Sequence, residues 1–243
     1  MRGIACHGAR SMAQVTETNF WHSWHQAYDD PDSDLSYRLA AVQQQIRAAL
    51  DTAPPGRLRA ISMCAGQGRD LIGVLATHPR RGDVTARLVE VDPRLAESAR
   101  TAARAASLPG VEVLTADAAL TGNYVGLVPA DLVLACGIFG NITDEDIKRT
   151  AGYCTQLCAR GGAVIWTRSR RAPDLVPQIC DWFSARGFEL AWISGPSTDW
   201  TVAAHRLAAS PAPLEPAARM FTFVAHNQTR RPDPTAGPCS PEP

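Results

Sequence analysis

Short apolar runs alternate with helical patterns from residue 58 to about residue 193, and this alternation limits the possible folds most strongly. Six runs predict strands, at 58–63, 86–91, 111–114, 130–135, 163–166 and 188–193. Helical patterns lie between them at 69–77, at 93–106, from 143 onward and at 174–185. Strands that alternate with helices form a parallel sheet with both faces covered. The predicted fold class is therefore α/β, a three-layer Rossmann-like sandwich.

The segments on either side of this alternation complete the predicted organisation. Apolar runs at 201–207 and 220–224 have no good helix between them, which predicts antiparallel closing strands. Helical patterns at 16–29 and 34–50 predict a helical N-terminal cap. We therefore expect four parts: a disordered N-terminus at 1–15, the cap at 16–55, the Rossmann-like domain at 56–226 and a disordered tail at 227–243.

Composition excludes several classes of function. The 24 Lys and Arg residues balance the 24 Asp and Glu residues, so no basic surface for nucleic acid is expected. No apolar run is long enough to cross a membrane, and no signal peptide is visible. Seven cysteines, an odd number at irregular spacing, suggest reduced thiols in the cytoplasm, and their spacing predicts no metal site. The oligomeric state stays open.

The loop after the first predicted strand carries the strongest motif. It reads Cys64-Ala65-Gly66-Gln67-Gly68-Arg69-Asp70 and leads into a helix. Glycine allows a positive φ or a close approach to a ligand. The loop lies at the carboxyl ends of the strands, where open α/β sheets bind their ligands. A tight structural turn is the alternative. The dinucleotide fingerprint requires a third glycine where this chain has Leu71, and the P-loop signature is also absent.

The ends of the next three strands carry the other candidate residues. Glu90 ends the second strand, where a carboxylate could accept both hydroxyl hydrogens of a ribose or simply be exposed. Asp117 follows the third strand and precedes Ala118. The fourth strand ends in a turn of small residues, Ala135-Cys136-Gly137.

In this order the four features resemble the class I S-adenosylmethionine-dependent methyltransferases, over about residues 56–225. The resemblance implies S-adenosylmethionine as cofactor. Its methionine part and ribose would lie in the glycine-rich turn and its ribose hydroxyls on Glu90. Its adenine amino group would lie on Asp117, beside the amide of Ala118. The implied cofactor residues of the two turns are Cys64, Ala65, Gly66, Gly68, Ala135, Cys136 and Gly137.

The chain departs from the family pattern at two positions. Ser62 stands where the family usually has an acidic residue, and Cys64 takes the position of the first glycine. Asp70, at the start of the next helix, is our candidate for the missing carboxylate that would bind the cofactor's amino group.

Methyl transfer from a sulfonium requires alignment and exclusion of water, and a base only where the acceptor must lose a proton. The catalytic residue therefore stays unknown, with His22, His25 and Asn141 as candidates; packing or surface roles are the alternative for the histidines. Phe139 and Asn141 follow the fourth-strand turn and could contact an acceptor. Arg168 and Arg170 follow the fifth strand and could bind an anionic acceptor, although a solvated turn explains them slightly better in so arginine-rich a chain.

The sequence thus predicts a cytoplasmic enzyme that methylates oxygen or nitrogen of a small molecule, with an anionic acceptor as one option. Two alternatives remain open. One is an NAD(P)-dependent oxidoreductase on the same fold, which Leu71 disfavours; the other is a non-catalytic S-adenosylmethionine-binding protein, which Ser62 and Cys64 keep open.

Overall fold

The computed structural model of the protein describes residue 30 and residues 32–224. The chain divides into two compact units, Met1–Ala40 and Ala41–Pro243. In the first unit the described residues include a turn, in which the amide of Asp32 donates to Asp30 Oδ1 at 3.0 Å. The predicted helix at 16–29 and the predicted disordered segments at 1–15 and 227–243 fall outside the described residues.

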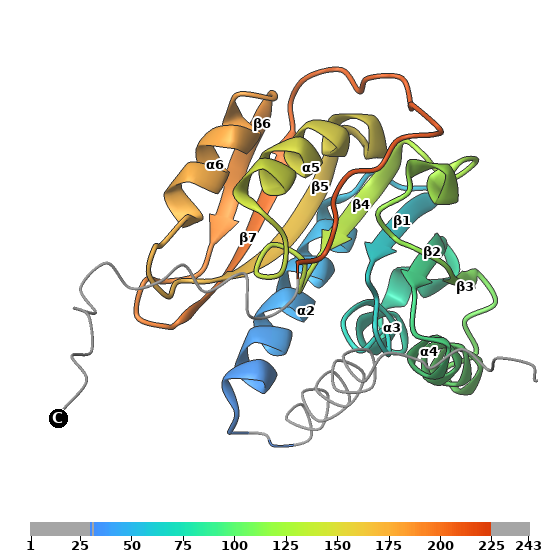
Figure 1. Ribbon diagram of the computed structural model, residues 1–243. Helices are drawn as coiled ribbons and strands as arrows, with labels where there is room; N and C mark the ends of the chain where they lie inside the picture. The colour runs from blue at the N-terminus through green and yellow to red at the C-terminus, as the bar shows by residue number, and fades with distance from the viewer. Residues whose placement is uncertain (1–29, 31, 225–243) are drawn as a thin grey trace, which may run out of the picture. The chain divides into compact units, whose positions relative to one another are not determined.

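The second unit is built around one seven-stranded sheet with the strand order β3-β2-β1-β4-β5-β7-β6 (Figure 1). All neighbouring pairs are parallel except those made by β7, which is antiparallel to both β5 and β6. The mostly parallel sheet with an antiparallel closing strand is therefore confirmed. Its strands are β1 (Leu58–Met63), β2 (Val84–Glu90), β3 (Val111–Thr115), β4 (Ala130–Ala135), β5 (Cys158–Ser169), β6 (Phe188–Ile193) and β7 (Trp200–Leu207).

Helices cover both faces because alternate strand residues point to opposite sides of the sheet. Met63, Val133 and Trp166 join one buried cluster, and Ala60, Leu132 and Ile165 join the other. The second cluster also contains buried residues of α2, from Val42 to Leu50. The helices are α2 (Asp34–Thr52), α3 (Leu71–Leu75), α4 (Pro93–Ala105), α5 (Asp144–Leu157) and α6 (Val176–Ser184), with short 3₁₀ turns at Pro79–Gly82 and Thr121–Tyr124.

Local signals explain where the helices begin. Asp92 accepts a hydrogen bond from Arg94 N at 2.8 Å at the start of α4, where Pro93 occupies the first position. Thr143 caps α5 by accepting from Asp146 N at 3.2 Å. The reciprocal bond of a capping box is replaced, because Asp146 Oδ2 accepts from Thr222 N at 2.8 Å instead.

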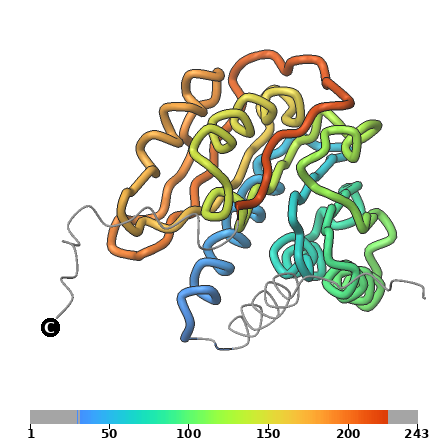
Figure 2. Tube along the Cα trace, viewed as in Figure 1, coloured from blue at the N-terminus to red at the C-terminus, as the bar shows by residue number. Residues whose placement is uncertain are grey.

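The run at 220–224 corrects one sequence prediction, because it does not form a second closing strand. The chain after β7 passes along α5 and reaches the loops that follow β3 and β4 (Figures 1 and 2). It makes only isolated bridges there, Leu120 with Arg219 and Ile142 with Phe223. We call residues 208–224 the C-terminal segment. Its apolar side chains Met220 and Phe221 are fully buried, which accounts for the apolar pattern without a strand.

Candidate functional site

The loop after β1 turns sharply at three residues with left-handed backbone. Cys64, Gly66 and Gly68 have φ values of 52°, 56° and 69°. A Cβ on Gly68 would lie 2.6 Å from Ile72 Cδ1 and 2.8 Å from Leu88 Cδ2. Gly68 is therefore required by the close approach of α3 to β2 as well as by its backbone conformation.

Glu90 joins this loop to the end of β2. Its Oε2 accepts from Gly66 N at 2.8 Å, and its Oε1 accepts from Asp92 N at 2.8 Å. The residue is only 7% exposed, and burial raises its carboxyl pKa while both backbone hydrogen bonds act to lower it. A carboxylate has about four lone-pair positions, so two remain for further donors. The structure thus brings together the two sequence features on which the ribose prediction depends.

Asp70 and Cys64 lie at the two ends of the loop. Asp70 Oδ1 accepts from Leu71 N at 2.7 Å at the start of α3, and burial raises its carboxyl pKa to about 6. Burial also raises the pKa of the Cys64 thiol, with further contributions from the carboxylates of Glu90 and Asp117. The carboxylates of Asp70, Glu90 and Asp117 therefore surround this loop. Such an arrangement favours the binding of a positively charged group.

Asp117 stands just beyond β3, with its carboxylate 41% exposed. Its Oδ1 accepts from Ala119 N at 2.9 Å, and its Oδ2 lies 2.8 Å from Arg219 Nη2 in an ion pair. Ala118 is buried, and its carbonyl accepts from Tyr124 Oη at 2.7 Å. The loop after β3 is consequently ordered from both sides, by the 3₁₀ turn and by the C-terminal segment.

The turn after β4 is held by side chains on both sides. Gly137, with φ of 77°, donates its amide to Thr167 Oγ1 at 2.8 Å, and its carbonyl accepts from Asn141 Nδ2 at 2.8 Å. Ala135 is fully buried and Cys136 is partly buried. Asn141 therefore braces this turn, and its side chain lies beside Gly137.

Phe139, a candidate for contact with an acceptor, is a core residue in this structure. Its ring is fully buried, 5.8 Å from the ring of Trp166 and 6.4 Å from that of Phe183. Its carbonyl accepts a hydrogen bond from the Arg168 guanidinium. Burial lowers the pKa of Arg168, as expected for a side chain that donates to the loop after β4 from inside the protein. The apolar residue type alone could not distinguish these two orientations.

Arg170 is likewise engaged within the protein. Its Nη1 lies 3.3 Å from Asp174 Oδ2, and its Nη2 donates to Ser194 O at 3.4 Å. The predicted anion-binding pair of Arg168 and Arg170 therefore already has protein partners on both members. The histidine candidates His22 and His25 lie outside the described residues.

Three residues that sequence reasoning missed also shape the site. Gln43 Nε2 donates to Arg69 O at 2.9 Å and so ties α2 to the glycine-rich loop. Thr167 holds Gly137, and Arg219 pairs with Asp117. Gln43 is separated from its partner by 26 residues and Thr167 by 30, so no local pattern could have revealed them.

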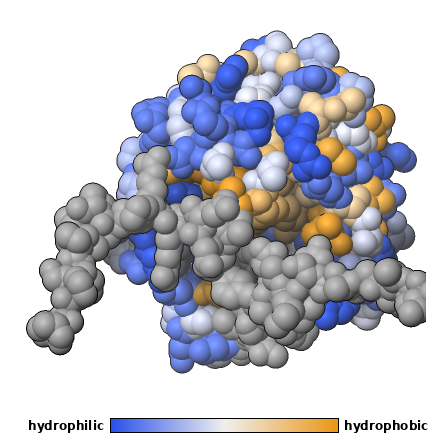
Figure 3. Space-filling view, viewed as in Figure 1, coloured by the Kyte–Doolittle hydropathy of each residue, from blue (hydrophilic) through white to orange (hydrophobic). Residues whose placement is uncertain are grey.

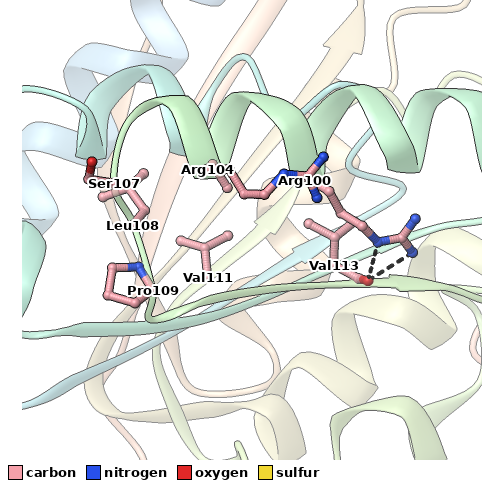
Figure 4. A pocket seen from close by; sticks show the side chains of 8 residues that line it. Arg100, Arg104, Ser107, Leu108, Pro109, Val111 and Val113 are labelled. Atoms are coloured by element: carbon pink, nitrogen blue, oxygen red, sulfur yellow. Dashed lines mark hydrogen bonds between the residues drawn. The ribbon is translucent and has the colours of Figure 1, made fainter.

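A shallow hollow of about 570 Å³ lies elsewhere, between α4 and the edge strand β3 (Figure 4). Its lining includes Ser107, Leu108 and Pro109, which precede β3, so it opens at the edge strand and not at the loop after β1. Arg100 crosses it and donates to Val113 O from Nε at 3.2 Å and from Nη2 at 3.0 Å. Arg100 thereby gives a hydrogen-bond partner to a carbonyl on the open edge of β3. This structural role accounts for the residues of the hollow without a ligand.

The strand order, the antiparallel β7 and the helices on both faces define the class I S-adenosylmethionine-dependent methyltransferase fold. Solved structures confirm this fold. Magnesium protoporphyrin IX methyltransferase from Synechocystis PCC 6803, solved with bound SAM, matches with a TM-score of 0.61 and 13% identity, over 83% of this chain and 99% of that one.

Two further methyltransferases share the fold. The 1,6-didemethyltoxoflavin-N1-methyltransferase of Burkholderia thailandensis matches with a TM-score of 0.56 and 11% identity, over 84% of this chain and 94% of that one. The CurJ carbon methyltransferase matches with a TM-score of 0.58 and 16% identity, over 76% of this chain and 58% of that one. No protein-family model and no curated protein matched the sequence. Among the described residues, none of the helices has the length and apolar character needed to span a bilayer.

Proposed function

We propose that the protein is an S-adenosylmethionine-dependent methyltransferase that acts on oxygen or nitrogen of a small molecule. The observation that carries this proposal is the hydrogen bond from Gly66 N to Glu90 Oε2, at 2.8 Å. It sets a buried carboxylate directly against the glycine-rich loop, at the carboxyl edge of a sheet with the methyltransferase strand order. The methyltransferases of the same fold support the proposal.

The donor and acceptor groups around this loop fit S-adenosylmethionine. Glu90 retains lone pairs for the ribose hydroxyls, and Asp117 has an exposed carboxylate for the adenine amino group, beside Ala118. We assign the cofactor's ammonium to Asp70, whose partly buried side chain lies at the far end of the loop. The methionine end is assigned to two turns, formed by Cys64, Ala65, Gly66 and Gly68 and by Ala135, Cys136 and Gly137.

The bound cofactor would supply a methyl group on a positively charged sulfur, which leaves alignment as the main task of the protein. The Gly137–Thr167 and Gly137–Asn141 hydrogen bonds hold the turn after β4 in one conformation. Asn141 therefore stays our candidate for contact with the acceptor. His22 and His25 stay candidates for a base where the acceptor must lose a proton. Arg168 and Arg170 stay candidates for an anionic acceptor. Each has a protein partner on Nη1, while its Nε is buried with no hydrogen-bond partner among the described residues.

Several observations support a small-molecule acceptor in the cytoplasm. The formal net charge is +0, which gives no attraction for nucleic acid as a whole. Figure 3 shows apolar surface in the middle of one face, with hydrophilic side chains above it, as an organic acceptor would require. The odd number of cysteines suits a reducing compartment.

Binding measurements would test the cofactor assignment first. We expect S-adenosylhomocysteine to raise the melting temperature and to give a saturable heat in isothermal titration calorimetry, whereas NADH should do neither. The opposite result would support the oxidoreductase alternative. Transfer of the labelled methyl of S-adenosylmethionine to a panel of phenols, carboxylates and amines would then test the activity. Tight binding with no transfer to any of them would favour the non-catalytic alternative.

A further inference from the structure

The C-terminal segment connects the two loops that the proposed function assigns to opposite ends of the cofactor. At the loop after β3, Thr121 N donates to Ala218 O at 3.0 Å, and Met220 N donates to Ala119 O at 2.8 Å. At the loop after β4, Val224 N donates to Asn141 O at 3.0 Å. The segment is thus bonded to the protein by its backbone on both sides of Arg219.

Arg219 is the charged side chain that this segment brings to the site. Its Nη2 lies 2.8 Å from Asp117 Oδ2, while Asp117 Oδ1 accepts from Ala119 N at 2.9 Å. Each oxygen of the carboxylate therefore has one fixed donor, which determines the plane of the carboxylate and where its unused lone pairs point. The side chains of Arg219 and Asp117 are 47% and 41% exposed, so both are accessible to a ligand.

We propose, resting on the proposed function, that Arg219 is a positioning residue for the purine base of the cofactor. By holding the Asp117 carboxylate in one orientation, it presents an acceptor to a 6-amino group. A purine with a 6-oxo group would meet the same carboxylate with a second acceptor, and an unpaired polar contact reduces affinity strongly. Arg219 thus contributes to the choice of adenine over hypoxanthine.

The test compares two ligands, S-adenosylhomocysteine and its 6-oxo analogue S-inosylhomocysteine, by isothermal titration calorimetry on the full chain. For Arg219→Met we expect about 5- to 20-fold weaker binding of S-adenosylhomocysteine and a preference over the analogue that shrinks by a similar factor. Arg219→Lys should retain part of that preference because its charge remains. In an Asp117→Asn background, Arg219→Met should change the affinity less than about twofold.

Arg206→Met is the matched control. Arg206 is exposed on β7 and donates to Gly161 O at 2.8 Å, near the start of β5. This part of the sheet lies away from the loop after β3. We expect it to leave both affinities unchanged. The melting temperature of Arg219→Met should stay close to that of the wild type, because an ion pair at this exposure adds little to stability and the backbone bonds of the segment remain.

The possible failures are distinguishable. If the wild type does not bind S-adenosylhomocysteine, the proposed function and this inference both fall. If the wild type binds and Arg219→Met binds equally well or more tightly, the inference alone is wrong. Weaker binding with an unchanged preference between the two ligands would also overturn it, because a merely structural role predicts that result.

Discussion

The backbone amide of Gly66 donates to Glu90 Oε2 at 2.8 Å, so the glycine-rich loop and the end of β2 form one unit. Gly66 reaches this position with a φ of 56°, in the left-handed region that favours glycine. The arrangement keeps a buried carboxylate at the edge of the sheet with lone pairs to spare. The first prediction follows from this geometry.

Glu90→Gln should separate ligand binding from stability. Glutamine offers one oxygen, so either Gly66 N or Asp92 N would face an NH₂ group, while removal of the buried charge acts in the opposite direction. We expect a net change of about 1 kcal/mol or less in the free energy of unfolding by urea. Affinity for S-adenosylhomocysteine should fall at least tenfold. Glu112→Gln, which removes an exposed partner of Arg87, should change neither quantity appreciably.

Gly68→Ala should destabilise the protein more than Gly126→Ala does. Both glycines have positive φ, 69° and 82°, which costs an alanine about 1–2 kcal/mol. A Cβ on Gly126 meets nothing within 4 Å, whereas a Cβ on Gly68 meets Ile72 and Leu88. The overpacking should add about 1–3 kcal/mol for Gly68→Ala alone. Equal losses in chemical denaturation would show that the contact between α3 and β2 gives way at little cost.

Asp70→Asn should change the pH dependence of stability in a known direction. Burial raises the Asp70 pKa from 3.8 to about 6, so between these values the folded state binds more protons than the unfolded state. The contribution of Asp70 to stability therefore falls as pH rises from about 4 to 6. The variant should lose this slope and be more stable than the wild type at pH 7, while asparagine keeps the cap on α3.

The same variant tests the assignment of the cofactor's ammonium. If Asp70 binds that group, Asp70→Asn should weaken binding of S-adenosylhomocysteine at least tenfold at pH 7.5. Unchanged affinity in calorimetry, together with the altered stability profile, would remove Asp70 from the site and leave it as a helix cap.

His205 should contribute a slope of the opposite sign. It is fully buried, its Nδ1 accepts from Trp166 Nε1 at 3.1 Å, and burial lowers its pKa from 6.5 to about 4. The unfolded state therefore binds more protons between these values, and stability is lost as pH falls from about 6.5 to 4, by on the order of 3 kcal/mol. His205→Asn, which keeps an acceptor for Trp166, should be less stable at pH 7 and lack this slope. Urea denaturation across that pH range would measure it, and an unchanged slope would refute the burial of a neutral histidine.

The elements that local patterns specify were predicted well. Strands β4 and β6 begin and end where their apolar runs do, and α4 begins at Pro93 behind its Asp92 cap. Apolar periodicity and capping act within a few residues, so both can be recognised from the sequence alone. The positions of Gly66 and Glu90 at strand ends could be predicted for the same reason.

Long-range pairing decided the rest. The insertion of β7 between β5 and β6 depends on register between distant strands. The run at 220–224 forms no strand because it pairs with the loops after β3 and β4, through isolated bridges, and not with a strand of the sheet. An apolar ring such as Phe139 suits a core or an acceptor site equally well, and only packing placed it in the core.

The sequence by itself determined the alternating α/β architecture, the sharp loop around Gly66 and the carboxylates at the strand ends, because each depends on residues close together in the chain. Only the tertiary structure decided that Arg219 meets Asp117 and that Arg168 supports Phe139 O. Such contacts join segments far apart in sequence, and their partners are selected by how the whole sheet and its helices pack.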